Sequence, residues 1–192
     1  MYSLFNTQEK QIFIGNILFV ICCVFYLAWW ILAFKPSGGV AKTGWLLVPA
    51  GISGLLGMFL ILLGILAKIP FKPLFPGIYI LLGGIAAYII LLAVTVLLLE
   101  RPATAELILI IGWIMLALAE INALFGSELF SHSRSITFIL LICAVFIISL
   151  ICYILYYRLD SLASYIDGMI PLILAALTMA GISCFIWAAQ KV

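Results

Sequence analysis

The sequence predicts an all-α integral membrane protein, built as a compact bundle of six transmembrane helices joined by short loops. Hydrophobic residues make up 68% of the 192 residues and charged residues only 8%. A soluble domain is nearer half apolar and a quarter charged. Too few polar side chains are present to cover a surface that faces water, so lipid must be the main solvent.

Six segments are long enough to cross a bilayer, because a span needs about 20 apolar residues. In chain order they cover residues 12–34, 45–67, 76–99, 104–125, 136–157 and 169–190. Backbone groups in lipid must be hydrogen-bonded within their own segment, so each span is expected to be a helix. No long polar stretch separates the spans. Residues 1–192 are therefore expected to form a single transmembrane domain.

The first three spans each carry a distinct signature. Span 12–34 is about twice as long as the apolar core of a signal peptide and no cleavage motif follows it, so we expect it to be permanent. One face of span 45–67 is lined by glycines, which let a second backbone approach closely. These glycines are Gly51, Gly54, Gly57 and Gly64. Pro76 begins the third span, where its missing amide donor does no harm.

The last three spans are marked mainly at their ends. Glu106 lies in the first turn of the fourth span, where an acid complements the helix dipole. Aromatic residues that favour the headgroup level close the first and fifth spans: Trp29, Trp30, Tyr153, Tyr156 and Tyr157. Pro171 begins the sixth span. Small residues recur along that span at four-residue steps: Ala176, Ala180 and Cys184.

Lysine and arginine are almost evenly divided between the two sides of the membrane. With the N-terminus inside, the inner segments hold Lys10, Lys68, Lys72, Arg134 and Lys191, and the outer ones Lys35, Lys42, Arg101 and Arg158. Cytoplasmic loops carry the excess of these residues. The small excess predicts that both termini are cytoplasmic.

Several classes of function have no support in the sequence. The net charge is only +2 and no basic stripe is present, which argues against a nucleic-acid partner. The cysteines form no CxxC pair, and His132 is the only histidine, so we expect neither a metal site nor another cofactor. The sequence contains none of the HExxH, GxSxG or P-loop patterns. No catalytic residue is assigned, and an enzyme is the less favoured class.

Glu120 is the one ionisable side chain well inside a span, about 8 Å of helix rise from the span's end. Intramembrane acids usually face the bundle interior, and a functional role is the default hypothesis. Glu120 would bind a cation, pass a proton or hold a polar headgroup. The alternative is a structural bond to a neighbouring helix. Trp113 lies seven residues earlier on a similar face, where it would either border a polar site or simply pack.

Three further residues are candidate ligands. Asn16 offers an amide within the first span, although such amides more often make interhelical hydrogen bonds. Asp160, Ser164 and Asp167 share one face of a predicted short amphipathic helix that lies along the membrane surface. The two aspartates would draw a cation or an amine towards the bundle, or form a solvated face that only turns the chain.

Three functions are consistent with these features. The first is a membrane protein that binds or conducts a small solute or lipid, with Glu120 at the site. The second is a non-catalytic accessory subunit, whose glycine faces pack on a partner membrane subunit or on copies of the same chain. The third is a small lipid-modifying membrane enzyme. The lipid bilayer is a partner in all three.

Overall fold

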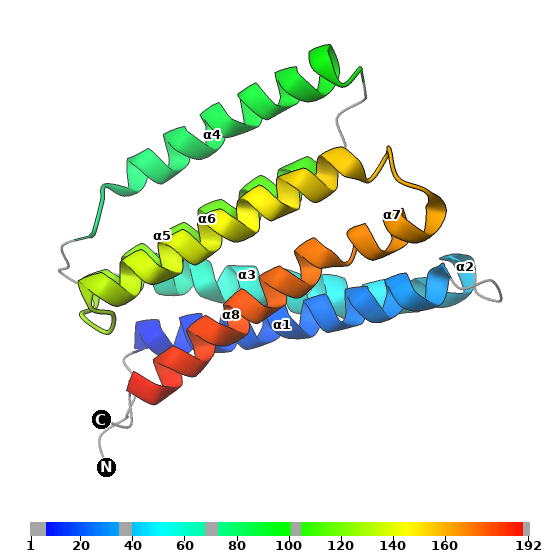
Figure 1. The fold of residues 1–192 in the computed structure, drawn as a ribbon. Helices are drawn as coiled ribbons and strands as arrows, with labels where there is room; N and C mark the ends of the chain where they lie inside the picture. The colour runs from blue at the N-terminus through cyan, green and yellow to red at the C-terminus, as the bar shows by residue number, and fades with distance from the viewer. Residues whose placement is uncertain (1–6, 35–39, 68–72, 101–104, 190–192) are drawn as a thin grey trace. The chain divides into compact units, whose positions relative to one another are not determined.

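The computed structural model describes residues 7–34, 40–67, 73–100 and 105–189. Six of its helices are long and apolar enough to cross a membrane, and the described residues contain no strand, which confirms the predicted fold class. The helices are labelled in Figure 1. In chain order they are α1 (Thr7–Ala33), α2 (Val40–Thr43), the 3-10 turn η1 (Gly44–Leu46), α3 (Leu47–Leu66), α4 (Gly77–Ala93), the π-helical turn η2 (Val94–Leu98), α5 (Ala105–Gly126), α6 (His132–Leu155), α7 (Ser161–Asp167) and α8 (Ile170–Ala189).

The predicted spans match these helices closely at most of their ends. The largest differences are at the end of α4, which stops at Ala93 and gives way to the π-helical turn η2, and at the starts of α1 and α6, which begin at Thr7 and His132 rather than at residues 12 and 136. Both extensions are rich in polar residues, some of which, such as Gln8 and Ser135, are buried. The predicted ends at Thr104 and Gln190 lie outside the described residues, as do Lys35, Lys68, Lys72, Arg101 and Lys191, on which the orientation depends.

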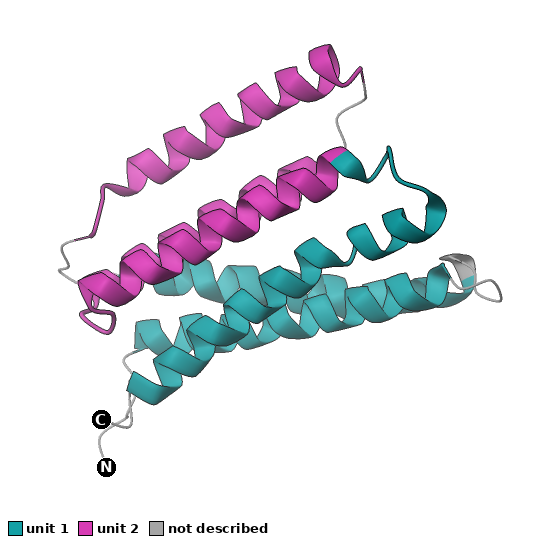
Figure 2. Ribbon diagram, viewed as in Figure 1, with its two compact units in different colours: residues 1–68, 155–192 teal, residues 69–154 magenta. Residues whose placement is uncertain are grey.

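Two compact units make up the chain (Figure 2). Unit 1 comprises Met1–Lys68 and Leu155–Val192, and unit 2 comprises Ile69–Ile154. The helices of unit 1 are therefore α1, α3, α7 and α8 with the short turns α2 and η1, and those of unit 2 are α4, α5 and α6. A single transmembrane domain remains a prediction.

Glycines bring α1 and α3 of unit 1 into close contact. A Cβ atom added at Gly57 would lie 2.8 Å from the carbonyl oxygen of Gly15, and one at Gly64 would lie 2.6 Å from Cγ1 of Ile12. Gly54 faces Cys22 in the same way. The predicted glycine face is confirmed at these positions and wrong at Gly51, which is exposed and has no such neighbour within 4 Å.

α8 also packs against α1, with a different face from the expected one. Its buried residues are Thr178, Met179, Ile182, Ser183 and Ile186. The small residue Cys184 is exposed, and Ala176 and Ala180 are only partly buried. The four-residue repeat of small side chains therefore does not mark the buried face of α8.

Unit 2 is packed through larger side chains. Leu107 and Ile111 of α5 and Tyr153 of α6 form a buried cluster, against which partly buried residues of α4 and α6 pack. α4 contacts α5, and a Cβ atom at Gly84 would meet the side chain of Met115. Unit 2 thus gathers around α5, the span in which the largest share of residues is buried.

Candidate functional site

Glu120 lies at the most enclosed level of α5. Its relative exposure is 0%, and the four residues that follow it are also buried: Ile121, Asn122, Ala123 and Leu124. Five consecutive helical residues point in every direction around the axis. α5 is therefore covered on all sides at this level, and the Glu120 carboxylate is held away from lipid.

Asn122 has a structural partner. Its Nδ2 donates to the Phe75 carbonyl oxygen at 3.0 Å, and its Oδ1 accepts from the Phe75 amide at 3.3 Å. One side chain thus satisfies both backbone groups of a residue two positions before α4 begins. Asn122 therefore fixes the entry of the chain into α4.

Trp113 is buried on α5 with 9% relative exposure. Its indole N–H has no hydrogen-bond acceptor within the described part of the chain. Seven residues correspond to roughly 10 Å along the helix and nearly two full turns, so Trp113 and Glu120 share a face of α5. α5 therefore offers a donor and a carboxylate along one buried face.

The other predicted ligands belong to unit 1. Asn16 is fully buried in α1, next to the Gly15 contact with α3. Asp160 and Asp167 flank α7, at opposite ends of that short helix. The candidate residues therefore form two groups: Glu120 and Trp113 in unit 2, and Asn16, Asp160 and Asp167 in unit 1.

The two aspartates have different surroundings, which corrects the expectation of one shared solvated face. Asp160 is exposed and caps α7, because its Oδ1 accepts a hydrogen bond from the Ala163 amide at 2.9 Å. Asp167 is buried, with 7% relative exposure. The predicted short helix is confirmed, but only one of its acids faces solvent.

Gln8 is a buried polar residue that the sequence analysis did not single out. Its relative exposure is 1%, and among the described residues neither its amide nitrogen nor its amide oxygen has a hydrogen-bond partner. The expected start of the first span at residue 12 placed Gln8 outside the membrane. The signal that could have revealed it is the helical spacing with Ile12, Gly15 and Asn16, all of which are buried.

Metal-binding geometry is not found in the described residues, where no three His, Cys, Asp or Glu side chains gather in a way that could hold an ion. All five cysteines are free thiols: Cys22, Cys23, Cys143, Cys152 and Cys184. The polar chemistry on α5 is thus that of a carboxylate and an indole donor.

Comparisons of the chain with family models, with curated proteins and with solved structures found no match.

Proposed function

We propose that this multi-pass membrane protein binds or conducts a small solute or lipid, and that Glu120 is the central ligand. The observation that carries the proposal is the complete burial of this carboxylate within a membrane-spanning helix. Trp113 contributes a hydrogen-bond donor on the same face of α5. Asn16, Asp160 and Asp167 are further proposed ligands in unit 1.

Energetics favours a role for Glu120 beyond packing. A charged side chain at the centre of a membrane helix costs about 3 kcal/mol on insertion scales, so such residues are rare and usually lie on a ligand or ion pathway. Apolar side chains would fill the same volume at no such cost. Asn122 shows that the neighbouring amide has a structural partner, whereas a carboxylate is suited to a cation, an amine or a transferable proton.

The direct test is native mass spectrometry of the purified full chain beside Glu120→Gln. Glutamine keeps the size of the side chain and removes its charge. We expect a small molecule or lipid to remain bound to the wild-type protein and to be lost from the variant, while the thermal unfolding temperature changes little.

Glu106→Gln is the matched control, because it makes the same change on the same helix at an exposed residue. We expect this variant to retain the ligand. If Glu120→Gln keeps the ligand and only lowers the unfolding temperature, Glu120 is a packing residue and the proposal fails.

An accessory-subunit role is the second candidate, and exposed glycines favour it. Gly51 and Gly83 are exposed and have open space around them, so a partner helix has room to approach there. The rest of the α3 glycine face already packs on α1 within the same chain. This second role is favoured if both the wild type and Glu120→Gln are free of ligand and only the wild type forms a defined oligomer.

The orientation is part of the same proposal. We place both termini in the cytoplasm, on the small excess of Lys and Arg that this orientation gives to the inner loops. Two variants test this orientation, Lys42→Cys and Arg134→Cys. Each is labelled in intact cells with a thiol reagent that does not cross the membrane. Only the Lys42→Cys variant should react from outside.

A further inference from the structure

The short helix α7 turns part of its polar side inward, while Asp160 and Ser161 at its start are exposed. Leu162 and Ile166 are exposed, at 68% and 49%, whereas Asp167 is buried. The Ser164 hydroxyl donates to the Tyr156 carbonyl oxygen at 2.8 Å. A helix on a water-facing surface would show the opposite arrangement, so the outer face of α7 is suited to contact lipid.

Aromatic rings lie under this inward face of α7. The Trp30 indole N–H donates to the Tyr165 carbonyl oxygen at 3.1 Å, and a Cβ atom at Gly168 would lie 2.7 Å from the Trp30 ring. The ring centroid of Trp30 is 4.7 Å from that of Phe34 and 6.4 Å from that of Tyr156. The buried Asp167 directly precedes Gly168, so it is the sequence neighbour of the residue that meets the Trp30 ring.

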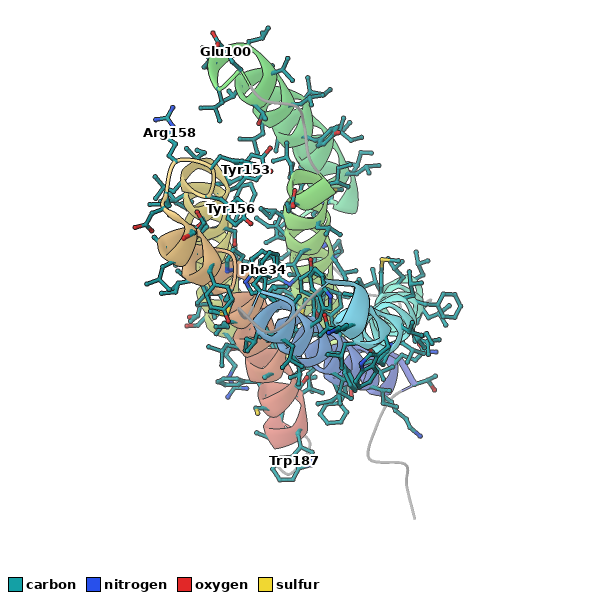
Figure 3. All side chains as sticks on the ribbon, turned by 90° about the vertical axis from the view of Figure 1, so that its right-hand side faces the viewer. Phe34, Glu100, Tyr153, Tyr156, Arg158 and Trp187 are labelled. Carbon is teal, nitrogen blue, oxygen red and sulfur yellow. The ribbon has the colours of Figure 1, made fainter. Side chains whose placement is uncertain are left out.

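The cluster opens outward at its rim. Phe34 is 51% exposed, and Tyr157, whose ring centroid is 5.2 Å from that of Tyr156, is 53% exposed. Arg158 follows and is also exposed; Figure 3 shows it directed away from the helix beyond Tyr156. A ligand at this rim would meet the exposed aromatic faces of Phe34 and Tyr157.

Trp29 adds an indole N–H group, which is a hydrogen-bond donor. Its indole nitrogen is buried and, within the described ranges, has no hydrogen-bond partner. The Trp29 ring lies 6.2 Å from that of Trp30 and 6.3 Å from that of Phe34, measured between centroids. Phosphate and ester oxygens are the acceptors that a lipid offers to an indole at the headgroup level.

We infer that this aromatic cluster, formed by Trp29, Trp30, Phe34, Tyr156 and Tyr157 with Asp167 and Arg158, binds the headgroup of a phospholipid that carries an ammonium group. Cations are attracted to the faces of Trp, Tyr and Phe, and the Asp167 charge adds to that attraction. Arg158 supplies the complementary charge for the phosphate.

A lipid fits these observations better than a soluble phosphoamine. The exposed Leu162 and Ile166 lie on the same short helix, where they would contact acyl chains. The rings lie in the last turns of α1 or directly after the ends of α1 and α6, where a span meets the headgroups. This site does not include Glu120, and it shares only Asp167 with the ligands proposed above.

Lipid titrations followed by native mass spectrometry test the inference on the full chain. The probes are phosphatidylethanolamine, phosphatidylcholine and phosphatidylglycerol with identical acyl chains. We expect the two ammonium lipids to bind about three- to thirtyfold more tightly than phosphatidylglycerol, as cation–π contacts imply. Phe34→Leu with Tyr157→Leu should abolish this preference, and because both residues are exposed the fold should survive. Asp167→Asn should also reduce it.

Trp45→Leu is the matched control, since Trp45 is 66% exposed and begins the next span outside the cluster. It should keep the preference. Equal binding of phosphatidylglycerol by the wild type, or an equal loss in Trp45→Leu, would leave only a general aromatic belt and overturn the inference. Free phosphoethanolamine that binds as tightly as the lipid would overturn the assignment to a lipid.

Discussion

The two units hold their helices together by different contacts. In unit 1, α1 and α3 approach until the backbone of Gly15 meets the backbone of Gly57. In unit 2, α4 meets α5 through the flexible side chain of Met115 above Gly84. Only 11% of the apolar stretch of α4 is buried, against 44% in α5. The helices of unit 1 are therefore held together by close backbone contact, and those of unit 2 by packing around the central helix α5.

This difference follows from how helices associate in lipid. Apolar burial gives little driving force there, so association depends on van der Waals packing and on polar bonds between helices. Glycines maximise packing but leave no space to adjust. Larger side chains tolerate change, because methionine in particular can repack. The polar groups of unit 2, Glu120 and Asn122, lie where its packing is most complete.

The largest effect is expected where a side chain would meet backbone. Gly57→Val should lower the free energy of unfolding by about 3 kcal/mol, because neither the Gly15 carbonyl nor α3 can move freely. Gly84→Val should cost about 1 kcal/mol, since Met115 can change rotamer. Gly51→Val, in open space on α3, should stay within about 0.5 kcal/mol. Reversible unfolding in detergent measures all three, and equal losses at Gly57 and Gly84 would remove the contrast between the units.

A smaller loss is expected for Asn122→Leu, at about 2 kcal/mol, because the partly buried amide and carbonyl of Phe75 would lose their partner. Thr137→Val is the control: Thr137 is exposed and bonds the Ser133 carbonyl at 3.0 Å, so its loss should cost no more than about 0.5 kcal/mol. Thermal unfolding of both variants checks this. If Asn122→Leu is no worse than Thr137→Val, polar bonds do not set the stability of unit 2.

The smallest effect should be a gain of stability. Within the described residues, the two non-glycine residues with positive φ are Glu100 at 51° and Glu128 at 63°, and both are in unit 2. A side chain costs about 1 kcal/mol in this left-handed region, so Glu128→Gly should stabilise by about that amount. Glu9→Gly, inside α1, should instead destabilise by about 1 kcal/mol. A shift of the same sign in both variants would show that the Glu128 backbone is not strained.

Much of the fold follows from local properties that the sequence displays. Six long apolar stretches require helices, because lipid offers the backbone no hydrogen bonds. The i, i+4 and i+7 spacing of Asp160, Ser164 and Asp167 correctly predicted α7. The glycine spacing also predicted that another helix approaches α3 closely. Each of these predictions depends only on neighbouring residues and on the solvent.

The tertiary structure decided which partners these elements meet. Nothing in the α3 sequence pointed to Gly15 of α1, and nothing near Asn122 pointed to the Phe75 backbone. The position of Trp30 beneath α7 also depends on residues more than a hundred positions apart. Hydropathy and periodicity determine whether a helix face is apolar or lined by small residues. The helix that packs on this face is set by which helices fit together. The sequence by itself therefore determined a six-helix membrane protein with a carboxylate in its fourth span. Tertiary packing decided that this carboxylate is fully buried.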